Sequence, residues 1–215
     1  MADAGHREVE LKWTLDAAGY RLVLAGVAAI ASGPEIQVQS NRFYDTADQD
    51  LRTGGLALRI RRENRAVVLT CKRRLAEQDA GLHQHHEWEC ALDPDLWKAL
   101  AAIDRLPDGL PLPEAVQQVV AGRPLLLLGG FENLRHQFRL GDEIVAVDRT
   151  EFAADQCEFE LEVETHDPLG ARRRWRSLLG DWGVAATAQP LTKMHRLLAR
   201  RADDRRDDAV YGPSR

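Results

Sequence analysis

The sequence predicts an α+β fold, in which eight antiparallel β-strands form a closed barrel, or tunnel, with a charged lumen and flanking helices. Charged and apolar residues alternate along Glu8-Val9-Glu10-Leu11-Lys12, and successive side chains of a strand point to opposite faces. The same alternation returns around Arg59, around Glu87 and from Glu158 to Glu164. Because the charged face carries both signs on nearly every strand, we interpret it as the interior of a closed sheet.

The strands are expected where apolar and β-branched residues alternate with polar ones between turn signals. The eight segments are Glu8 to Lys12, Ile36 to Thr46, Leu56 to Arg62, Ala66 to Arg73, Leu82 to Leu92, Phe131 to Leu140, Glu143 to Phe152 and Gln156 to His166. The pair across Gly141-Asp142 has the two-residue turn of a β-hairpin. All three cysteines fall on the apolar phase of these strands, where small hydrophobic residues pack under helices.

Helices are expected where a polar cap precedes an apolar stripe. Thr14 is expected to cap a helix across Leu15 to Ile30, which Gly33-Pro34 ends. Asp93-Pro94 and Asp167-Pro168 each place a capping aspartate before a proline at the first helical position. The second of these helices is expected to run to about Trp182. Shorter helical segments are expected across Asp48 to Gly55, between Pro113 and Gly122, and across Gln189 to Arg201.

The length of 215 residues fits one domain. We expect this domain to span residues 1–201, with a core at about 6–166 and C-terminal helices at 167–201. The charged tail at 202–215 is expected to be disordered.

Composition and charge exclude several classes of protein. A formal net charge of −5 argues against a general nucleic-acid binder. We expect no secretory signal and no membrane partner, because the N-terminus is polar and no apolar run approaches about 20 residues. Three widely separated cysteines indicate neither a disulfide framework nor a zinc knuckle. We therefore expect a cytoplasmic monomer or homodimer.

The charged residues on the lumen phase fall into two sets whose chemistry is complementary. The basic set suits a polyanion because arginine and lysine bind phosphate oxygens. It is Lys12, Arg59, Arg61 and Lys72, with Arg135 on the later hairpin and Lys193 on the last helix. The acidic set, whose oxygens are ligands for Mg²⁺ or Mn²⁺, is Glu8, Glu10, Glu87, Glu89, Asp148, Glu160 and Glu162. Together the two sets predict a site for a metal ion and a polyphosphate.

An ordered series of motifs between about Glu8 and His195 resembles the CYTH domain of the triphosphate tunnel metalloenzymes. The series is EVELK, FYDT, LRTGGLALRIRR, TCK, EWE, the mid-chain Arg135, VD, FELEVE and a late TK. The motifs GLHQHHEWE and LTKMHR resemble bacterial members that hydrolyse inorganic triphosphate. The family fold, an eight-stranded antiparallel tunnel, agrees with the strands expected above.

The resemblance implies a role for each set. The basic residues would bind a triphosphate-containing small molecule, and Mg²⁺ or Mn²⁺ would be held by Glu8, Glu10, Asp148, Glu160 and Glu162. Glu10, Lys12, Glu87 and Glu89 would act in the catalytic step, the last two by positioning metal or water. The implied reaction is hydrolysis of inorganic triphosphate to diphosphate and phosphate, through in-line attack of a metal-activated water.

Several alternatives remain open at the level of sequence. The same fold would serve a thiamine triphosphatase, a nucleoside triphosphatase or a class IV-type adenylate cyclase. A non-catalytic module that binds polyphosphate or nucleotide is an alternative of another class. The run from Glu158 to Glu164 offers overlapping Glu-x-Glu registers, and Arg139 is in phase with Arg135. His83, His85 and His86 invite a zinc site, but we interpret them as polar residues at a strand end.

Overall fold

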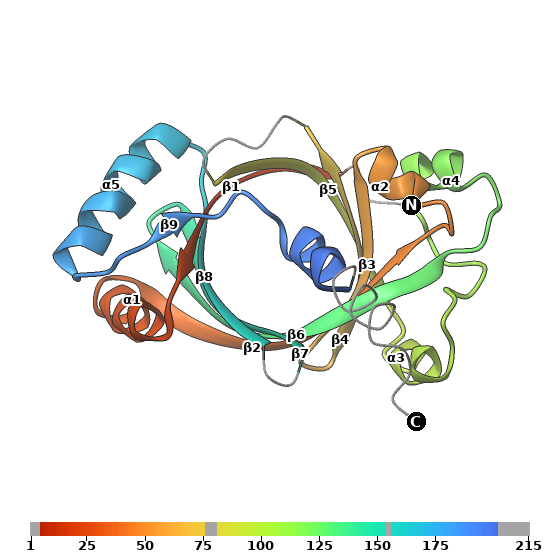
Figure 1. The fold of residues 1–215 in the computed structure, drawn as a ribbon, viewed down its shortest axis with the longest axis horizontal. Helices are drawn as coiled ribbons and strands as arrows, with labels where there is room; N and C mark the ends of the chain where they lie inside the picture. Colours follow the sequence, from red (N-terminus) through yellow and green to blue (C-terminus); the bar gives the residue numbers. More distant parts are fainter. Residues whose placement is uncertain (1–4, 76–80, 154–155, 202–215) are drawn as a thin grey trace, which may run out of the picture.

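The computed structural model describes residues 5–75, 81–153 and 156–201. The predicted charged tail lies outside these residues. Eight long strands form the body of the fold: β1 (His6–Leu15), β2 (Ser32–Asp45), β3 (Leu56–Glu63), β4 (Ala66–Arg74), β5 (Leu82–Leu92), β6 (Leu126–Leu140), β7 (Glu143–Ala153) and β8 (Gln156–Glu164). They pair antiparallel in the order β5-β4-β3-β2-β6-β7-β8-β1, and β1 returns to pair with β5. The predicted antiparallel barrel is therefore confirmed, and Figure 1 shows its closed ring.

Strand β1 closes the barrel. Its first half lies against β5, with His6 opposite Glu87, and its second half lies against β8, with Leu15 opposite Phe159. Beyond the segment of β1 that pairs with β5, the short strand β9 (Thr187–Ala188) pairs with β1 at Trp13 and Thr14. Both edges of β1 are thus hydrogen-bonded, which fixes the register of its charged residues.

Two groups of helices cover opposite sides of the ring (Figure 1). On one side lie α1 (Ala17–Ile30) and α5 (Pro168–Asp181), and on the other lie α2 (Asp50–Thr53), α3 (Leu96–Ala99), a 3₁₀ turn (Leu100–Ala102) and α4 (Glu114–Val120). The first group packs on a core that includes Trp13, Val163 and Trp175. The second packs on a core that includes Leu51 and Ile60. The apolar side chains of the strands therefore point outward, under the helices.

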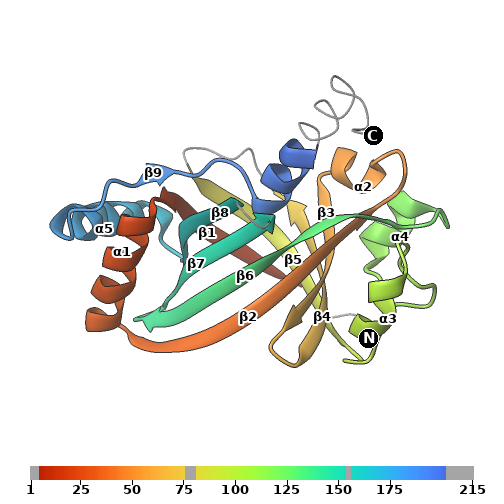
Figure 2. The same ribbon diagram turned by 60° about the horizontal axis from the view of Figure 1, so that its bottom comes forward.

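The last described helix, at 193–201, lies at one end of the barrel lumen (Figures 1 and 2). Met194 and Leu197 on this helix pack with Phe43 and Phe131 of the barrel wall. This contact holds the helix so that its polar residues enter the lumen. Across residues 5–75, 81–153 and 156–201, no helix combines the length and the apolar character needed to cross a membrane.

The expected start of the first helix is wrong by two residues. Thr14 does not cap it, because β1 runs on through Thr14 to Leu15, whose side chain is buried in the core. Helix α1 begins after Asp16, whose carboxylate accepts a hydrogen bond from the Gly19 N–H at 2.6 Å. The helix ends at Ile30, and Gly33-Pro34 lies inside β2 instead of terminating it.

Other differences are similar in kind. Helix α3 begins at Leu96, since the Asp93 carboxylate accepts a hydrogen bond from the Asp95 N–H and forms a turn first. The final helix begins at 193 instead of Gln189, because β9 and an extended segment precede it. Cys71 and Cys90 pack in the core as expected, whereas Cys157 is exposed.

Candidate functional site

The interior of the barrel contains a cavity of about 320 Å³. Alternate residues of the strands line it, so that Glu8, Glu10 and Lys12 of β1 face the cavity. Leu11 and Trp13, which alternate with them, are buried in the outer core. The two faces of β1 thus have the orientation expected from the sequence.

Two groups of side chains in the lumen have the composition of divalent-cation sites. One is Glu8, Glu10 and His85, and the other is Asp148, Glu160 and Glu162. In each group, one ligand atom per residue lies within 4.8 Å of the others. The carboxylates expected from the sequence to form one metal set are therefore divided between two places in the lumen.

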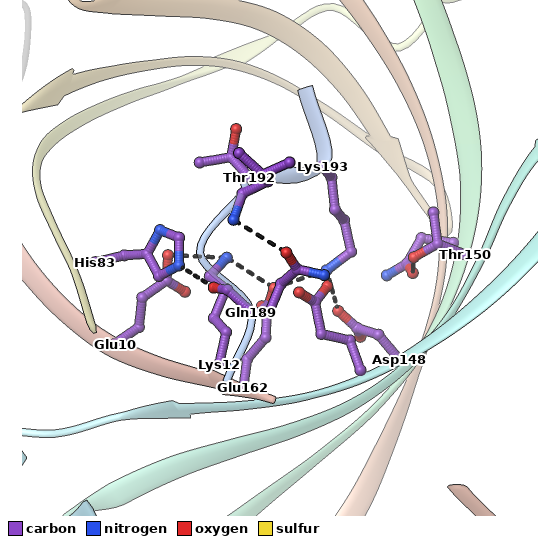
Figure 3. Close-up of polar contacts among 12 residues, drawn as sticks. Glu10, Lys12, His83, Asp148, Thr150, Glu162, Gln189, Thr192 and Lys193 are labelled. Atoms are coloured by element: carbon purple, nitrogen blue, oxygen red, sulfur yellow. Dashed lines mark hydrogen bonds and ion pairs between the residues drawn. The ribbon is translucent and has the colours of Figure 1, made fainter. Parts of the chain in front are cut away.

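Lys12 separates the two groups. Its Nζ lies 3.0 Å from Glu10 Oε1 and 2.8 Å from Glu162 Oε1 (Figure 3). Burial opposes a charge on Lys12, but the neighbouring carboxylates of Glu10 and Glu162 outweigh it and raise the pKa of the ammonium. Lys12 is thus a buried cation that belongs to both groups.

Two unpartnered atoms indicate that these groups can accept a cation. Glu160 Oε1 and His85 Nδ1 are buried, and neither has a hydrogen-bond partner within the described parts of the chain. Glu160 Oε2, in contrast, lies 2.7 Å from Lys193 Nζ and 2.9 Å from an Arg196 nitrogen. A buried acceptor without a donor is costly, and a cation would satisfy it. The donor sets, oxygen with or without one imidazole nitrogen, fit Mg²⁺ or Mn²⁺.

The three-carboxylate group is surrounded by cations. Arg135 binds both oxygens of Asp148, at 2.8 and 2.7 Å, and also contacts Glu162. Lys193 lies 2.8 Å from Asp148 and 2.7 Å from Glu162. Burial alone would raise the pKa of Glu162, but Lys12, Lys193 and Arg135 together hold it well below its usual value. Glu162 is therefore ionised at neutral pH.

In the group of Glu8, Glu10 and His85, the pKa values shift in different directions. Burial raises the pKa of Glu10 to about 7 against the effect of Lys12, so that its carboxyl is partly protonated at neutral pH. Burial acts on Glu8 in the same direction, but the Lys72 ammonium holds the pKa of Glu8 well below its usual range. Burial lowers the pKa of His85, which keeps its imidazole neutral.

Arg59 and Arg61, on β3, line the cavity, and their contacts with carboxylates are long. Arg59 lies 3.9 Å from its nearest carboxylate, on Glu87, and Arg61 lies 3.3 Å from both Glu63 and Glu89. The Nε of Arg59 is buried and has no hydrogen-bond partner among the described residues, whereas the Nε of Arg61 is the atom that lies 3.3 Å from Glu63. Burial, with the nearby charge of Arg59, lowers the pKa of Arg61 to about 10, which leaves it cationic. These donors fit an anion inside the cavity.

A neutral hydrogen-bonded network fills another part of the lumen. Thr150 donates to Asn133 at 2.7 Å, Asn133 donates to Gln39 at 3.0 Å, and Gln39 donates to Gln37 at 3.0 Å. Asn41, beside Arg59, has a buried Nδ2 without a partner in the described chain. These amides were not predicted from the sequence, because neutral side chains give no charge pattern.

The histidines lie at the start of β5, as interpreted from the sequence, but two of them are buried in the lumen. His83 and His85 are 0% and 5% exposed, and they precede Glu87 and Glu89 on the lumen face of β5. Burial lowers the pKa of His83 to about 3. His86 points to the other face, where its ring centroid lies 4.3 Å from that of Trp88. The alternation His83, His85, Glu87, Glu89 was the available signal.

The structure distinguishes Arg135 from Arg139 on β6, and the glutamates of β8 from one another. Arg135 faces the lumen, whereas Arg139 is exposed. On β8, Glu160 and Glu162 belong to the three-carboxylate group, and Glu164 lines the cavity. Glu158 instead pairs with Arg196 at 2.8 Å and with Arg200. Arg196, which also contacts Glu160, is a further lumen residue that the sequence analysis missed.

Comparison with known proteins identifies the family of this chain. The sequence pattern of the CYTH domain matches residues 6–174. The chain belongs to the CYTH domain family. No curated protein matches this CYTH chain at a significant level.

Solved structures of similar fold support the assignment. A Hippeastrum protein, named as an adenylyl cyclase and reported to have a dominant triphosphatase activity, is 25% identical over 89% of this chain and 95% of its own, with a TM-score of 0.77. A Bacillus halodurans protein provisionally named an adenylate cyclase is 19% identical over 88% of this chain and 96% of its own, with a TM-score of 0.68. A Pyrococcus horikoshii protein is 17% identical over 87% of this chain and 98% of its own, with a TM-score of 0.58. The last two show the CYTH fold alone.

Proposed function

We propose that this CYTH protein hydrolyses inorganic triphosphate to diphosphate and phosphate, with Mg²⁺ or Mn²⁺ as its cofactor. The observation that carries the proposal is that the six predicted cationic side chains line one cavity, next to two candidate metal groups that reach it through Glu8, Glu10, His85 and Glu162. An anion of high charge density is the ligand that such a lumen suits. The triphosphatase activity reported for the Hippeastrum protein supports the reaction class.

The residues of the cavity would have different roles according to their chemistry. Arg59, Arg61 and Arg135 would bind phosphate oxygens through paired N–H groups, while Lys12, Lys72 and Lys193 would act as point charges. The carboxylates of the two metal groups would hold the cation. A bound divalent cation neutralises phosphoryl charge and lowers the pKa of coordinated water. Glu87, at 3.4 Å from Lys72, and Glu89, at 3.3 Å from Arg61, would orient these two cations.

The test is a comparison of specificity constants for tripolyphosphate, thiamine triphosphate and ATP, with Mg²⁺ or Mn²⁺ and with chelator. We expect tripolyphosphate to be the best substrate, diphosphate to be a product, and chelator to abolish turnover. A higher specificity constant for ATP than for tripolyphosphate, with a cyclic product, would contradict the proposal. Tight binding of triphosphate without phosphate release, unaffected by chelator, would instead show a non-catalytic binding module.

One observation favours a second candidate, a triphosphate ester with an organic group. Phe43 and Phe131 line the cavity next to Met194, with ring centroids 5.7 Å apart. Such a wall offers an apolar surface on which a thiamine or nucleobase ring could pack. The same comparison of substrates decides between the two candidates.

Replacing Arg59 with methionine should weaken substrate binding more than it slows the chemical step. The variant keeps an unbranched apolar stem but removes donors that have no close carboxylate partner. We expect KM for tripolyphosphate to rise by about 10- to 100-fold, as for the loss of a charged hydrogen bond of about 1.5–3 kcal/mol. Arg139→Met, at the exposed end of β6, is the control and should leave KM unchanged. A fall in kcat alone would contradict the assigned role.

A further inference from the structure

His85 lies beside two carboxylates with one ring nitrogen unused. Its Nδ1 is 3.7 Å from Glu8 Oε2 and 3.9 Å from Glu10 Oε1. Both distances exceed those of a hydrogen bond, and this nitrogen has no other partner in the part of the chain that the structure describes. The residue is only 5% exposed, so water does not readily satisfy it.

These separations are within the range of ligands around one ion, and the same two oxygens already contact cations, Glu8 Oε2 the ammonium of Lys72 and Glu10 Oε1 that of Lys12. With metal–ligand bonds of 2.0–2.2 Å, neighbouring ligand atoms lie roughly 3–4 Å apart. His83, on the same face of β5 and equally buried, also has an Nδ1 without a partner among the described residues, but it belongs to neither metal group. Its Nε2 is held at 2.8 Å from the carbonyl oxygen of Gln189.

We propose that Glu8, Glu10 and His85 form a separate cation site with a nitrogen ligand, which takes a transition-metal ion such as Mn²⁺, Co²⁺ or Zn²⁺ in preference to Mg²⁺. Imidazole favours transition metals, whereas carboxylates and water suit Mg²⁺. The group of Asp148, Glu160 and Glu162 offers oxygen alone. The two groups of one lumen therefore differ in the metal that each selects.

The experiment measures cation binding in the absence of substrate, so its outcome is independent of the proposed hydrolysis. Purified wild-type protein, His85→Gln and the matched control His83→Gln are stripped with chelator and titrated with Co²⁺ or Mg²⁺ alone. Calorimetry gives affinity and stoichiometry, and the visible absorption of Co²⁺ reports the ligand environment. A circular dichroism spectrum of each variant verifies its fold.

We expect His85→Gln to weaken Co²⁺ binding at one site by at least about tenfold and to change the Co²⁺ spectrum, while Mg²⁺ affinity changes by less than about threefold. His83→Gln should bind both ions like the wild type. Unchanged Co²⁺ affinity in a folded His85→Gln protein, or an equal loss in His83→Gln, would overturn the proposal.

A second measurement uses the wild-type chain and does not depend on a variant that folds. With ¹⁵N-labelled histidine and ¹¹³Cd²⁺, we expect scalar coupling between the ion and the Nδ1 of one imidazole. No coupling to any histidine at saturating Cd²⁺ would refute a nitrogen ligand.

Discussion

Replacement of Glu160 by glutamine is expected to lower metal-dependent phosphate release by about a thousandfold, the scale on which loss of one preorganised charged group acts in catalysis. The substitution preserves shape but removes the charge of a side chain that is 1% exposed. It also removes the acceptor Oε1, which is unpartnered among the described residues and is the atom best placed to bind a cation. Initial rates with tripolyphosphate and Mg²⁺ or Mn²⁺ measure the effect.

Glu158→Gln is the matched control on the same strand. Glu158 points to the same side of β8, but its partners are Arg196 and Arg200 and it belongs to neither metal group. We expect this variant to retain turnover within about a few-fold of the wild type, as is usual for the loss of a partly exposed ion pair. An equal loss of turnover in both variants would contradict the assignment of Glu160, and not Glu158, to the catalytic site. Full activity of Glu160→Gln would show that Glu160 does not belong to the site.

Replacement of Trp175 by alanine is expected to cause a large loss of stability. This side chain is 0% exposed in the core between α5 and the barrel, and its indole N–H donates to Glu143 Oε2 at 3.0 Å. Removing it leaves a cavity and an unsatisfied buried carboxylate oxygen, and comparable substitutions cost about 3–5 kcal/mol. The free energy of unfolding from urea titration measures this loss.

Leu169→Ala serves as its control, because Leu169 lies on the same helix but is 71% exposed. Its free energy of unfolding should stay within about 0.5 kcal/mol of the wild type. A small loss for Trp175→Ala would mean that α5 contributes little to the core, contrary to the packing described above.

The sequence predicted the strands well because their signal is local. Alternation along β3, β4 and β5 placed these strands to within a residue or so at each end, since one face had to be apolar and the other charged. Helix starts were less accurate. Thr14 and Asp16 are both good capping residues, and only the pairing of Thr14 with β8 and β9 decides between them.

The charged residues of the site followed from the same alternation, but their grouping did not. Whether Glu10 lies with Asp148 or with His85 depends on how strands far apart in the sequence curve around the lumen, and a single strand carries no such information. Arg196 was missed for a related reason. It lies on a helix, and only tertiary packing at one end of the barrel brings it to Glu160.

The double pairing of β1 has a consequence for the order in which the molecule assembles. Lys12 and Glu162, joined across β1 and β8, are 150 residues apart in the chain. The entropy of closing so long a loop has to be overcome before that contact contributes, so we expect ring closure to be a late step of folding. Because Glu8, Glu10 and Lys12 all lie on the closing strand, the cation and anion sites take shape only when synthesis has passed β8.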